Sequence, residues 1–147
     1  MLTHCDFVYA GANAKFQLPF VNLGLVPEFG SSWSLPARSG YLRAAELVML
    51  GQPFDARLAA EIGLVTQVVS DARVLDTAIE AASKLAAKPP AALQACKRLM
   101  KRSQREQIAQ AIAVENEEFA SHVRSAEAKE AFTAFLEKRA PDFARAK

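Results

Sequence analysis

Residues 18–32 read Leu18-Pro19-Phe20-Val21-Asn22-Leu23-Gly24-Leu25-Val26-Pro27-Glu28-Phe29-Gly30-Ser31-Ser32. This stretch places a single carboxylate, Glu28, among apolar neighbours and directly before a Gly-Ser-Ser sequence that is typical of a helix start. An apolar environment disfavours the charged form of a carboxylate, whereas a nearby helix N-terminus favours it. These opposed influences suit a residue that takes up and returns a proton near neutral pH. Glu28 is therefore the candidate catalytic residue.

The composition of the whole chain is that of a globular protein. Of its 147 residues, 51% are hydrophobic and 23% are charged, and the formal net charge is +2. A chain of this length fits one domain with a sizeable core. The small net charge, with no basic patch interleaved with aromatic residues, predicts no nucleic-acid partner. The basic run at 97–105 is interpreted as a solvated helix face rather than an anion site.

The cysteines and histidines do not form a metal-binding pattern. Cys5 and Cys96 are isolated, and His4 and His122 are far from both in sequence. We therefore expect no metal site, no bound cofactor and reduced cysteines. No apolar run approaches the roughly 20 residues that cross a membrane, and no signal peptide is evident. The predicted location is the cytoplasm, without a membrane partner.

Strands are predicted only in the first half of the chain. Short β-branched or alternating segments predict strands at 5–10, 14–18 and 64–69, with a turn at 11–13. Such short strands at the beginning of a chain need partners, because an isolated hairpin is marginal in water. This imbalance is the first indication of a missing upstream part.

The remaining sequence predicts helices. Ser31 or Ser32 is expected to cap the first of them, which Gly40 ends, and Asp55 is expected to cap a helix over 56–62. Further helices are predicted over about 42–50, from about 71 to the Pro89-Pro90 pair, from there past Met100, and around 108–119 and 125–138. The helix around 108–119 is marked by Ile108, Ala111, Ile112, Glu115 and Phe119. The expected apolar positions of the other helices are Val74, Leu75, Ala78, Ile79, Ala82 and Leu85; Leu93, Cys96 and Met100; and Phe132, Phe135 and Leu136.

Several landmarks together resemble a known family. Cys5–Ala10 is similar to its C/A-D-hydrophobic strand, Ala14–Pro19 to A-x-F-x-x-P and Leu23–Pro27 to L-G-hydrophobic-x-P. Ala59–Val65 is similar to A-x-x-x-G-L-V, and Ala134–Phe143 to A-F-x-E-K-R-x-P-x-F. The chain thus resembles the C-terminal half of the crotonase superfamily, the enoyl-CoA hydratase/isomerase family.

Two positions make one branch of that family the better match. Hydratases carry a catalytic glutamate directly after the first proline of this region, where this chain has Phe20. The acid here follows the second proline, as Pro27-Glu28. This arrangement resembles the Δ3,Δ2-enoyl-CoA isomerases, in which one glutamate moves a proton along the acyl chain.

The resemblance implies a mechanism and a set of site residues. Glu28 would remove the proton α to the thioester of a 3-enoyl-CoA and return it at the γ carbon, while two backbone N–H groups hold the dienolate oxygen. Phe20, Leu25 and Phe29 would line the acyl pocket, and Lys138 would reach a phosphate of coenzyme A, which enters as part of the substrate. Two alternatives stay open: Glu28 as a structural carboxylate at a helix start, and Lys138 as a solvated residue of the last helical turn.

The resemblance also implies an architecture. It predicts an α/β, crotonase-like fold of which the chain has the C-terminal portion: a single domain with strands and helices over roughly 1–70 and a helical trimerisation region over roughly 71–147. The oxyanion-hole segments of the family would lie upstream, so we expect little activity from this chain alone. We expect a homo-oligomer, a trimer or a dimer of trimers. The alternatives are an enoyl-CoA hydratase and a non-catalytic oligomerisation module.

Overall fold

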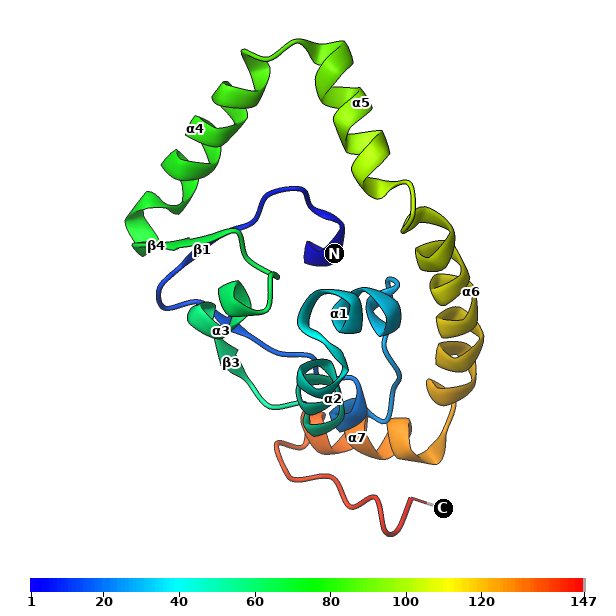
Figure 1. Ribbon diagram of the computed structural model, residues 1–147. Helices are drawn as coiled ribbons and strands as arrows, with labels where there is room; N and C mark the ends of the chain where they lie inside the picture. Colours follow the sequence, from blue (N-terminus) through cyan, green and yellow to red (C-terminus); the bar gives the residue numbers. More distant parts are fainter. Residues whose placement is uncertain (147) are drawn as a thin grey trace. The chain divides into compact units, whose positions relative to one another are not determined.

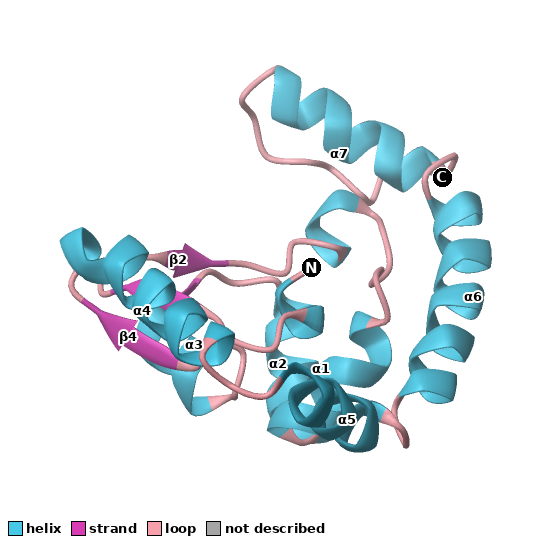
Figure 2. Cartoon of the chain, turned by 90° about the horizontal axis from the view of Figure 1, so that it is seen from above, coloured by secondary structure: helices cyan, strands magenta, loops and turns pink. Residues whose placement is uncertain are grey.

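The computed structural model describes residues 1–146, and helices make up most of them. Helices appear cyan and the few short strands magenta in Figure 2. The contacts divide the chain into two compact units, each formed by two separate stretches of sequence. The first unit comprises residues 1–16 and 54–108, and the second comprises 17–53 together with the chain from 109 onward. The two units are described one at a time.

Four short strands in the first unit form two separate pairs. β1 (Tyr9–Gly11) pairs in parallel with β4 (Gln67–Val69), and β2 (Lys15–Phe16) pairs antiparallel with β3 (Phe54–Asp55). The predicted strands at 5–10, 14–18 and 64–69 are therefore too long, and β3 was not predicted. Their partners come from about 40 or more residues away in the sequence, which local patterns do not encode. The stacked rings of Phe16 and Phe54, 5.7 Å apart, fix the register of the second pair.

The helices of the first unit begin where local chemistry places them. α3 (Ala56–Glu61) is capped as predicted, because the Asp55 carboxylate accepts a hydrogen bond from the Leu58 N–H at 2.8 Å. The short 3₁₀ helices η1 (Leu2–His4) and η3 (Asp71–Arg73) precede β1 and α4 (Val74–Ala86), respectively. α5 (Pro90–Lys101) starts with a proline at its first position, where the missing N–H costs nothing.

The second unit contains α1, α2 and α7 together with the segment that leads to Glu28. α1 (Ser31–Ser39) and α2 (Tyr41–Leu50) are joined at Gly40 and lie against one another (Figure 1). The 3₁₀ helix η2 (Val21–Leu23) packs on α2 and on α7 (Ala126–Leu136). α6 (Arg105–His122) contributes its residues from Ala109 onward to this unit.

Small residues on α7 allow the neighbouring backbone to approach this helix closely. Its buried residues are Ala128, Ala131 and Ala134, spaced three apart along one face. A Cβ atom added to Gly24 would lie 2.7 Å from the Ala128 nitrogen, which shows how closely the backbone of the η2 segment approaches α7. Phe135 and Leu136, predicted as apolar packing positions, are instead 75% and 79% exposed.

The predicted apolar faces of α4 and α5 are also more exposed than expected. Leu75 and Ile79 on α4 and Met100 on α5 are more than half exposed, whereas Val74, Ala78 and Leu85 are half-buried. Neither helix has a fully buried residue. Cys5 and Cys96 are both free and exposed. Within residues 1–146, no helix combines the length and the apolar character needed to span a membrane.

Candidate active site

Glu28 lies in the turn that leads from the η2 segment into α1. Its backbone carbonyl accepts hydrogen bonds from the Ser31 N–H at 3.0 Å and from the Ser31 hydroxyl at 2.6 Å. Ser31 is buried at the start of α1, so this pair fixes the backbone at Glu28. The side chain of Glu28 is exposed. The residue thus has a fixed backbone and a carboxylate that faces solvent.

The two residues after Glu28 adopt the left-handed conformation. Phe29 has φ 59° and Gly30 has φ 69°. Glycine adopts this conformation freely, but for a phenylalanine it costs on the order of 1–3 kcal/mol and persists only where surrounding contacts impose it. The Phe29 side chain is 55% exposed, so burial of its ring does not explain the conformation.

A carboxylate from α6 occupies the N-terminus of α1. Glu115, only 5% exposed, accepts hydrogen bonds from the Gly30 N–H at 2.6 Å and from the Ser32 N–H at 2.8 Å. These two N–H groups are among those that a helix start leaves without a partner in the helix. The prediction that Ser31 or Ser32 caps α1 is therefore wrong: Gly30 is the N-cap residue, and a carboxylate 83 residues beyond Ser32 completes the cap.

The cap by Glu115 bears on the structural interpretation of Glu28. The alternative to catalysis was that Glu28 accepts backbone N–H groups at the helix start, but Glu115 has that role. Across the described part of the chain, the Glu28 carboxylate has no hydrogen bond or ion pair. It is left available for a ligand or for solvent.

Phe20 and Leu25, the other predicted pocket residues, are linked through the backbone. The Phe20 carbonyl accepts hydrogen bonds from the N–H groups of Leu23 and Leu25, at 3.0 and 2.9 Å. Gly24, with φ 65°, allows the chain to turn back between them. Both side chains are half-buried, three or more residues before Glu28. The structure thus brings Phe20 and Leu25 together in the segment that leads to the Glu28 turn.

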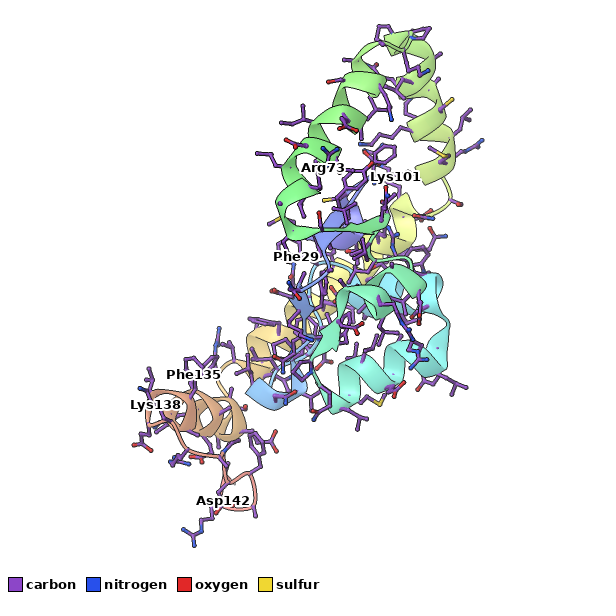
Figure 3. The ribbon with its side chains drawn as sticks, turned by 90° about the vertical axis from the view of Figure 1, so that its left-hand side faces the viewer. Phe29, Arg73, Lys101, Phe135, Lys138 and Asp142 are labelled. Atoms are coloured by element: carbon purple, nitrogen blue, oxygen red, sulfur yellow. The ribbon has the colours of Figure 1, made fainter. Side chains whose placement is uncertain are left out.

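Lys138 lies at the end of α7, away from that turn. Figure 3 draws Phe29 and Lys138 well apart. Lys138 is exposed and left-handed, with φ 55°. Its N–H donates to the Phe135 carbonyl and the Arg139 N–H donates to the Ala134 carbonyl, which is the Schellman pattern of a helix end. The structure therefore does not place Lys138 beside the other predicted site residues.

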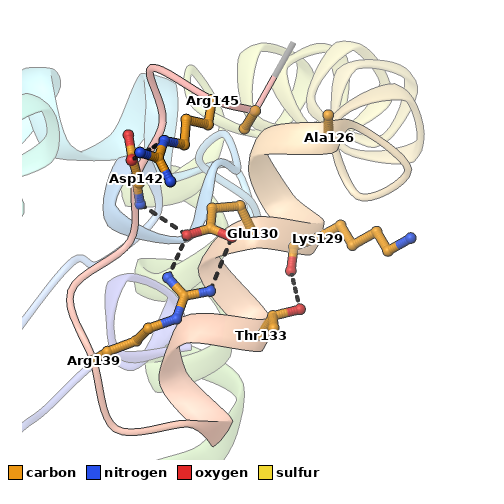
Figure 4. Close-up of a pocket in the computed structure, with 8 residues that line it drawn as sticks. Ala126, Lys129, Glu130, Thr133, Arg139, Asp142 and Arg145 are labelled. Carbon is orange, nitrogen blue, oxygen red and sulfur yellow. Dashed lines mark hydrogen bonds and ion pairs between the residues drawn. The ribbon is translucent and has the colours of Figure 1, made fainter.

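An ion-pair network holds the chain that follows α7. Arg139 donates to both carboxylate oxygens of Glu130, at 2.5 and 3.1 Å, and the Asp142 N–H donates to Glu130 at 2.8 Å (Figure 4). The hydrogen bond from Arg139 lowers the pKa of Glu130 from its usual 4.5 to about 2. These residues line an open cleft of about 500 Å³ between α7 and the tail, together with Lys129 and Arg145.

Glu115 is the functional candidate that sequence reasoning overlooked. It is one of the residues whose spacing marks this helix in the sequence, and Ile112 and Phe119 lie half-buried on the same stripe. A lone carboxylate within an apolar helical stripe is a usable signal, because a buried charge requires a partner. The sequence does not reveal which partner it finds. Within residues 1–146, no cluster of three His, Cys, Asp or Glu residues suited to a metal ion is found.

Comparisons with known proteins agree with the resemblance in the sequence. The family model described as enoyl-CoA hydratase/isomerase matches residues 1–146. A 2,3-dehydroadipyl-CoA hydratase of Escherichia coli K12 is 37% identical over 139 residues, which are 95% of this chain and 54% of that protein. A 1,2-epoxyphenylacetyl-CoA isomerase of the same organism is 36% identical over 138 residues, covering 94% of this chain and 53% of that protein.

The solved structures show the same relationship. The crystal structure of an enoyl-CoA hydratase/isomerase from Pseudoalteromonas atlantica T6c superimposes with a TM-score of 0.92 and 40% sequence identity, over 97% of this chain and 57% of that one. The chain spans about half the length of the curated relatives that it matches. A family match over residues 1–146, with the same fold, shows that the chain belongs to the enoyl-CoA hydratase/isomerase family.

Proposed function

We propose that this chain carries the proton-transferring glutamate of an enoyl-CoA isomerase that acts on fatty acyl-CoA thioesters. The observation that carries the proposal is the state of Glu28: an exposed carboxylate on a fixed backbone, whose possible structural role is taken by Glu115. A carboxylate that is neither buried nor paired is free to exchange a proton with a bound substrate.

The proposed reaction uses one carboxylate in both directions. The Glu28 carboxylate removes a proton from C2 of a 3-enoyl-CoA, and the electron pair moves onto the thioester oxygen to give a dienolate. The Glu28 carboxylic acid then returns the proton at C4, which gives the 2-enoyl-CoA and restores the carboxylate. The dienolate oxygen needs two N–H donors, and no residue of this chain is assigned to them.

Phe20, Leu25 and Phe29 support isomerisation over hydration. Phe20 occupies the position where the family resemblance expects the glutamate of a hydratase, and its side chain is half-buried. Phe20, Leu25 and Phe29 are apolar and precede or follow Glu28 closely, so they suit the walls of an acyl pocket from which water is excluded. We also propose that Lys138 contacts a phosphate of coenzyme A. This coenzyme A is bound by the same chain or by a neighbouring copy.

Hydration of an enoyl-CoA is the second candidate. It is favoured by the names of relatives such as the 2,3-dehydroadipyl-CoA hydratase. The two reactions differ in their products: hydration adds a hydroxyl group from water, whereas isomerisation moves the double bond and leaves the mass unchanged. Mass spectrometry of the product made in ¹⁸O-labelled water separates them.

Association into a homo-oligomer is proposed as well. The exposed aromatic and aliphatic side chains at the end of α7, Phe132, Phe135 and Leu136, support contact with another copy of the chain. A trimer or a dimer of trimers is the expected form. An assembly module without catalysis would keep this property and lack the activity tested below.

The decisive experiment replaces Glu28 by glutamine. Conversion of a short 3-enoyl-CoA to the 2-enoyl-CoA is measured with the chain alone and with a hybrid in which the chain replaces the matching part of an enoyl-CoA hydratase. We expect Glu28→Gln to lower kcat by about 10²- to 10⁴-fold, the usual contribution of a general base.

Glu117→Gln is the matched control, since Glu117 is an exposed carboxylate on α6 and should leave kcat unchanged. If Glu28→Gln keeps the kcat of the unmodified protein, or if neither unmodified preparation isomerises the substrate, the proposed function is wrong.

A further inference from the structure

Glu115 is the only buried residue of α6 among those described. Its charge is compensated by two hydrogen bonds, to the N–H groups of Gly30 and Ser32 at 2.6 and 2.8 Å. It also lies at the positive end of the α1 dipole, where a carboxylate is favoured. Removing the carboxylate would leave both N–H groups without their acceptor. The residue is therefore tied to one place, the start of α1.

The two N–H groups lie within and just after the left-handed part of the turn. Gly30 follows Phe29, and both residues have positive φ. A hydrogen bond to the Gly30 N–H fixes the peptide group that joins Phe29 to Gly30, and the bond to Ser32 fixes the first turn of α1. At the beginning of the turn, the Glu28 carbonyl accepts hydrogen bonds from the N–H and the hydroxyl group of Ser31. The backbone from Glu28 to Ser32 is thus held at both ends.

We propose that Glu115 is a positioning residue for the proton transfer assigned to Glu28, an inference that rests on the proposed function. Glu115 exchanges no proton with the substrate, because its carboxylate is buried against the backbone of the turn. It holds Phe29 and Gly30 in the left-handed conformation and so fixes the direction from which the Glu28 carboxylate and the Phe29 ring meet an acyl chain. Orientation of this kind governs kcat more than substrate binding.

Amide hydrogen exchange of the ¹⁵N-labelled 147-residue chain tests the structural part. In Glu115→Ala, we expect the Gly30 and Ser32 amides to exchange roughly 10- to 100-fold faster, since each loses a hydrogen bond to a charged group. Glu115→Gln keeps one acceptor oxygen and should give a smaller change. The amides of Ala44 in α2 and Lys129 in α7 should keep their protection, as should all of these amides in the control Glu117→Gln.

Kinetics test the functional part, in the same preparations as those used for Glu28→Gln. Glu115→Ala should lower kcat by about 10- to 100-fold with KM close to that of the unmodified protein, which is the effect of a misdirected catalytic group. Glu115→Gln should restore part of the loss. In the double variant Glu28→Gln/Glu115→Ala, the second change should add almost nothing, because Glu115 acts through Glu28.

The outcomes separate the two proposals. Uniform loss of protection across α1, α2 and α7 in both Glu115 variants, or a double variant with multiplied losses, would show general destabilisation and overturn the positioning role. If Glu28→Gln is inactive while Glu115→Ala is as active as Glu117→Gln, the proposed function stands and the positioning role is wrong. If Glu28→Gln keeps its activity, the proposed function fails and the positioning role fails with it.

Discussion

At the scale of single residues, the backbone is left-handed at two residues other than glycine among residues 1–146. These are Phe29 and Lys138. Phe29 follows the candidate base, and Lys138 is the residue for which a phosphate contact is proposed. Conformations of this kind are retained where the surrounding structure imposes them, and they gather at functional sites. For Lys138 the Schellman end of α7 accounts for the conformation, whereas no helix end of this kind accounts for it at Phe29.

Replacing Lys138 by glycine separates its backbone from its side chain. Glycine adopts φ 55° without the steric cost that lysine has, so Lys138→Gly should raise the free energy of unfolding by about 1 kcal/mol. The measurement is urea denaturation followed by circular dichroism. The control Lys129→Gly, in the middle of α7, should lower the free energy of unfolding by about 1 kcal/mol. If Lys138→Gly also lowers the free energy of unfolding, the left-handed backbone conformation at Lys138 is contradicted.

At the scale of elements, caps and close packing define the helices. Asp55 caps α3 and Ser125 caps α7, and in each cap the side-chain oxygen accepts a hydrogen bond from the backbone N–H three residues on. Sequence patterns predict such local caps well, because donor and acceptor are neighbours in the chain. The cap of α1 is different, since its acceptor comes from α6 and no local pattern contains it.

The contact of η2 with α7 depends on the absence of a side chain at Gly24. In Gly24→Ala, the new Cβ would lie 2.7 Å from the Ala128 nitrogen, and φ 65° would add backbone strain. We expect a loss of roughly 2–4 kcal/mol in the free energy of unfolding, the sum of overpacking and strain.

Gly63→Ala is the matched control for this contact. Gly63 has φ 71°, but a Cβ there meets nothing within 4 Å, so only the strain of about 1 kcal/mol applies. Denaturant unfolding of both variants gives the comparison. Equal losses at the two positions would show that the close approach of Gly24 to α7 contributes nothing.

At the scale of the whole molecule, each compact unit holds an ionised carboxylate against cations. In the first unit, hydrogen bonding to Lys97 lowers the pKa of Asp6, with a further contribution from Lys101. In the second unit, hydrogen bonding to Arg139 lowers the pKa of Glu130 to about 2. A lowered pKa in the folded state contributes stability above the usual pKa, and this contribution is lost as the pH falls through the folded value.

Acid should therefore weaken both units. For Glu130, the contribution is complete above about pH 4.5 and disappears as the pH falls through about 2; for Asp6, it declines below the usual value of 3.8. We expect the free energy of unfolding to fall over this range, and to fall less in the double variant Asp6→Asn/Glu130→Gln. Urea denaturation at pH 5 and pH 2 measures the difference. If the double variant loses as much stability as the unmodified protein, these two carboxylates do not govern the acid response.

The helices and the candidate base follow from local patterns, and the rest of the site does not. The apolar stretch around Glu28, the helix ends at Gly40 and Gly51 and the cap of α3 all depend on neighbours in the chain. Strand lengths were overestimated because β1 and β2 extend only where β4 and β3 supply partners. The faces predicted to be buried on α4 and α5 are largely exposed, since periodicity does not show what covers a helix.

The sequence by itself determined the family, most of the helices and the acid between Pro27 and Phe29, because each is encoded by residues close together in the chain. Only the tertiary structure decided that Glu115 caps α1 and that Glu28 is thereby left unpaired. Both carboxylates suit a helix N-terminus equally well in physical terms. The choice between them depends on the packing of α6, which brings Glu115 to that place although it lies 85 residues along the chain from Gly30.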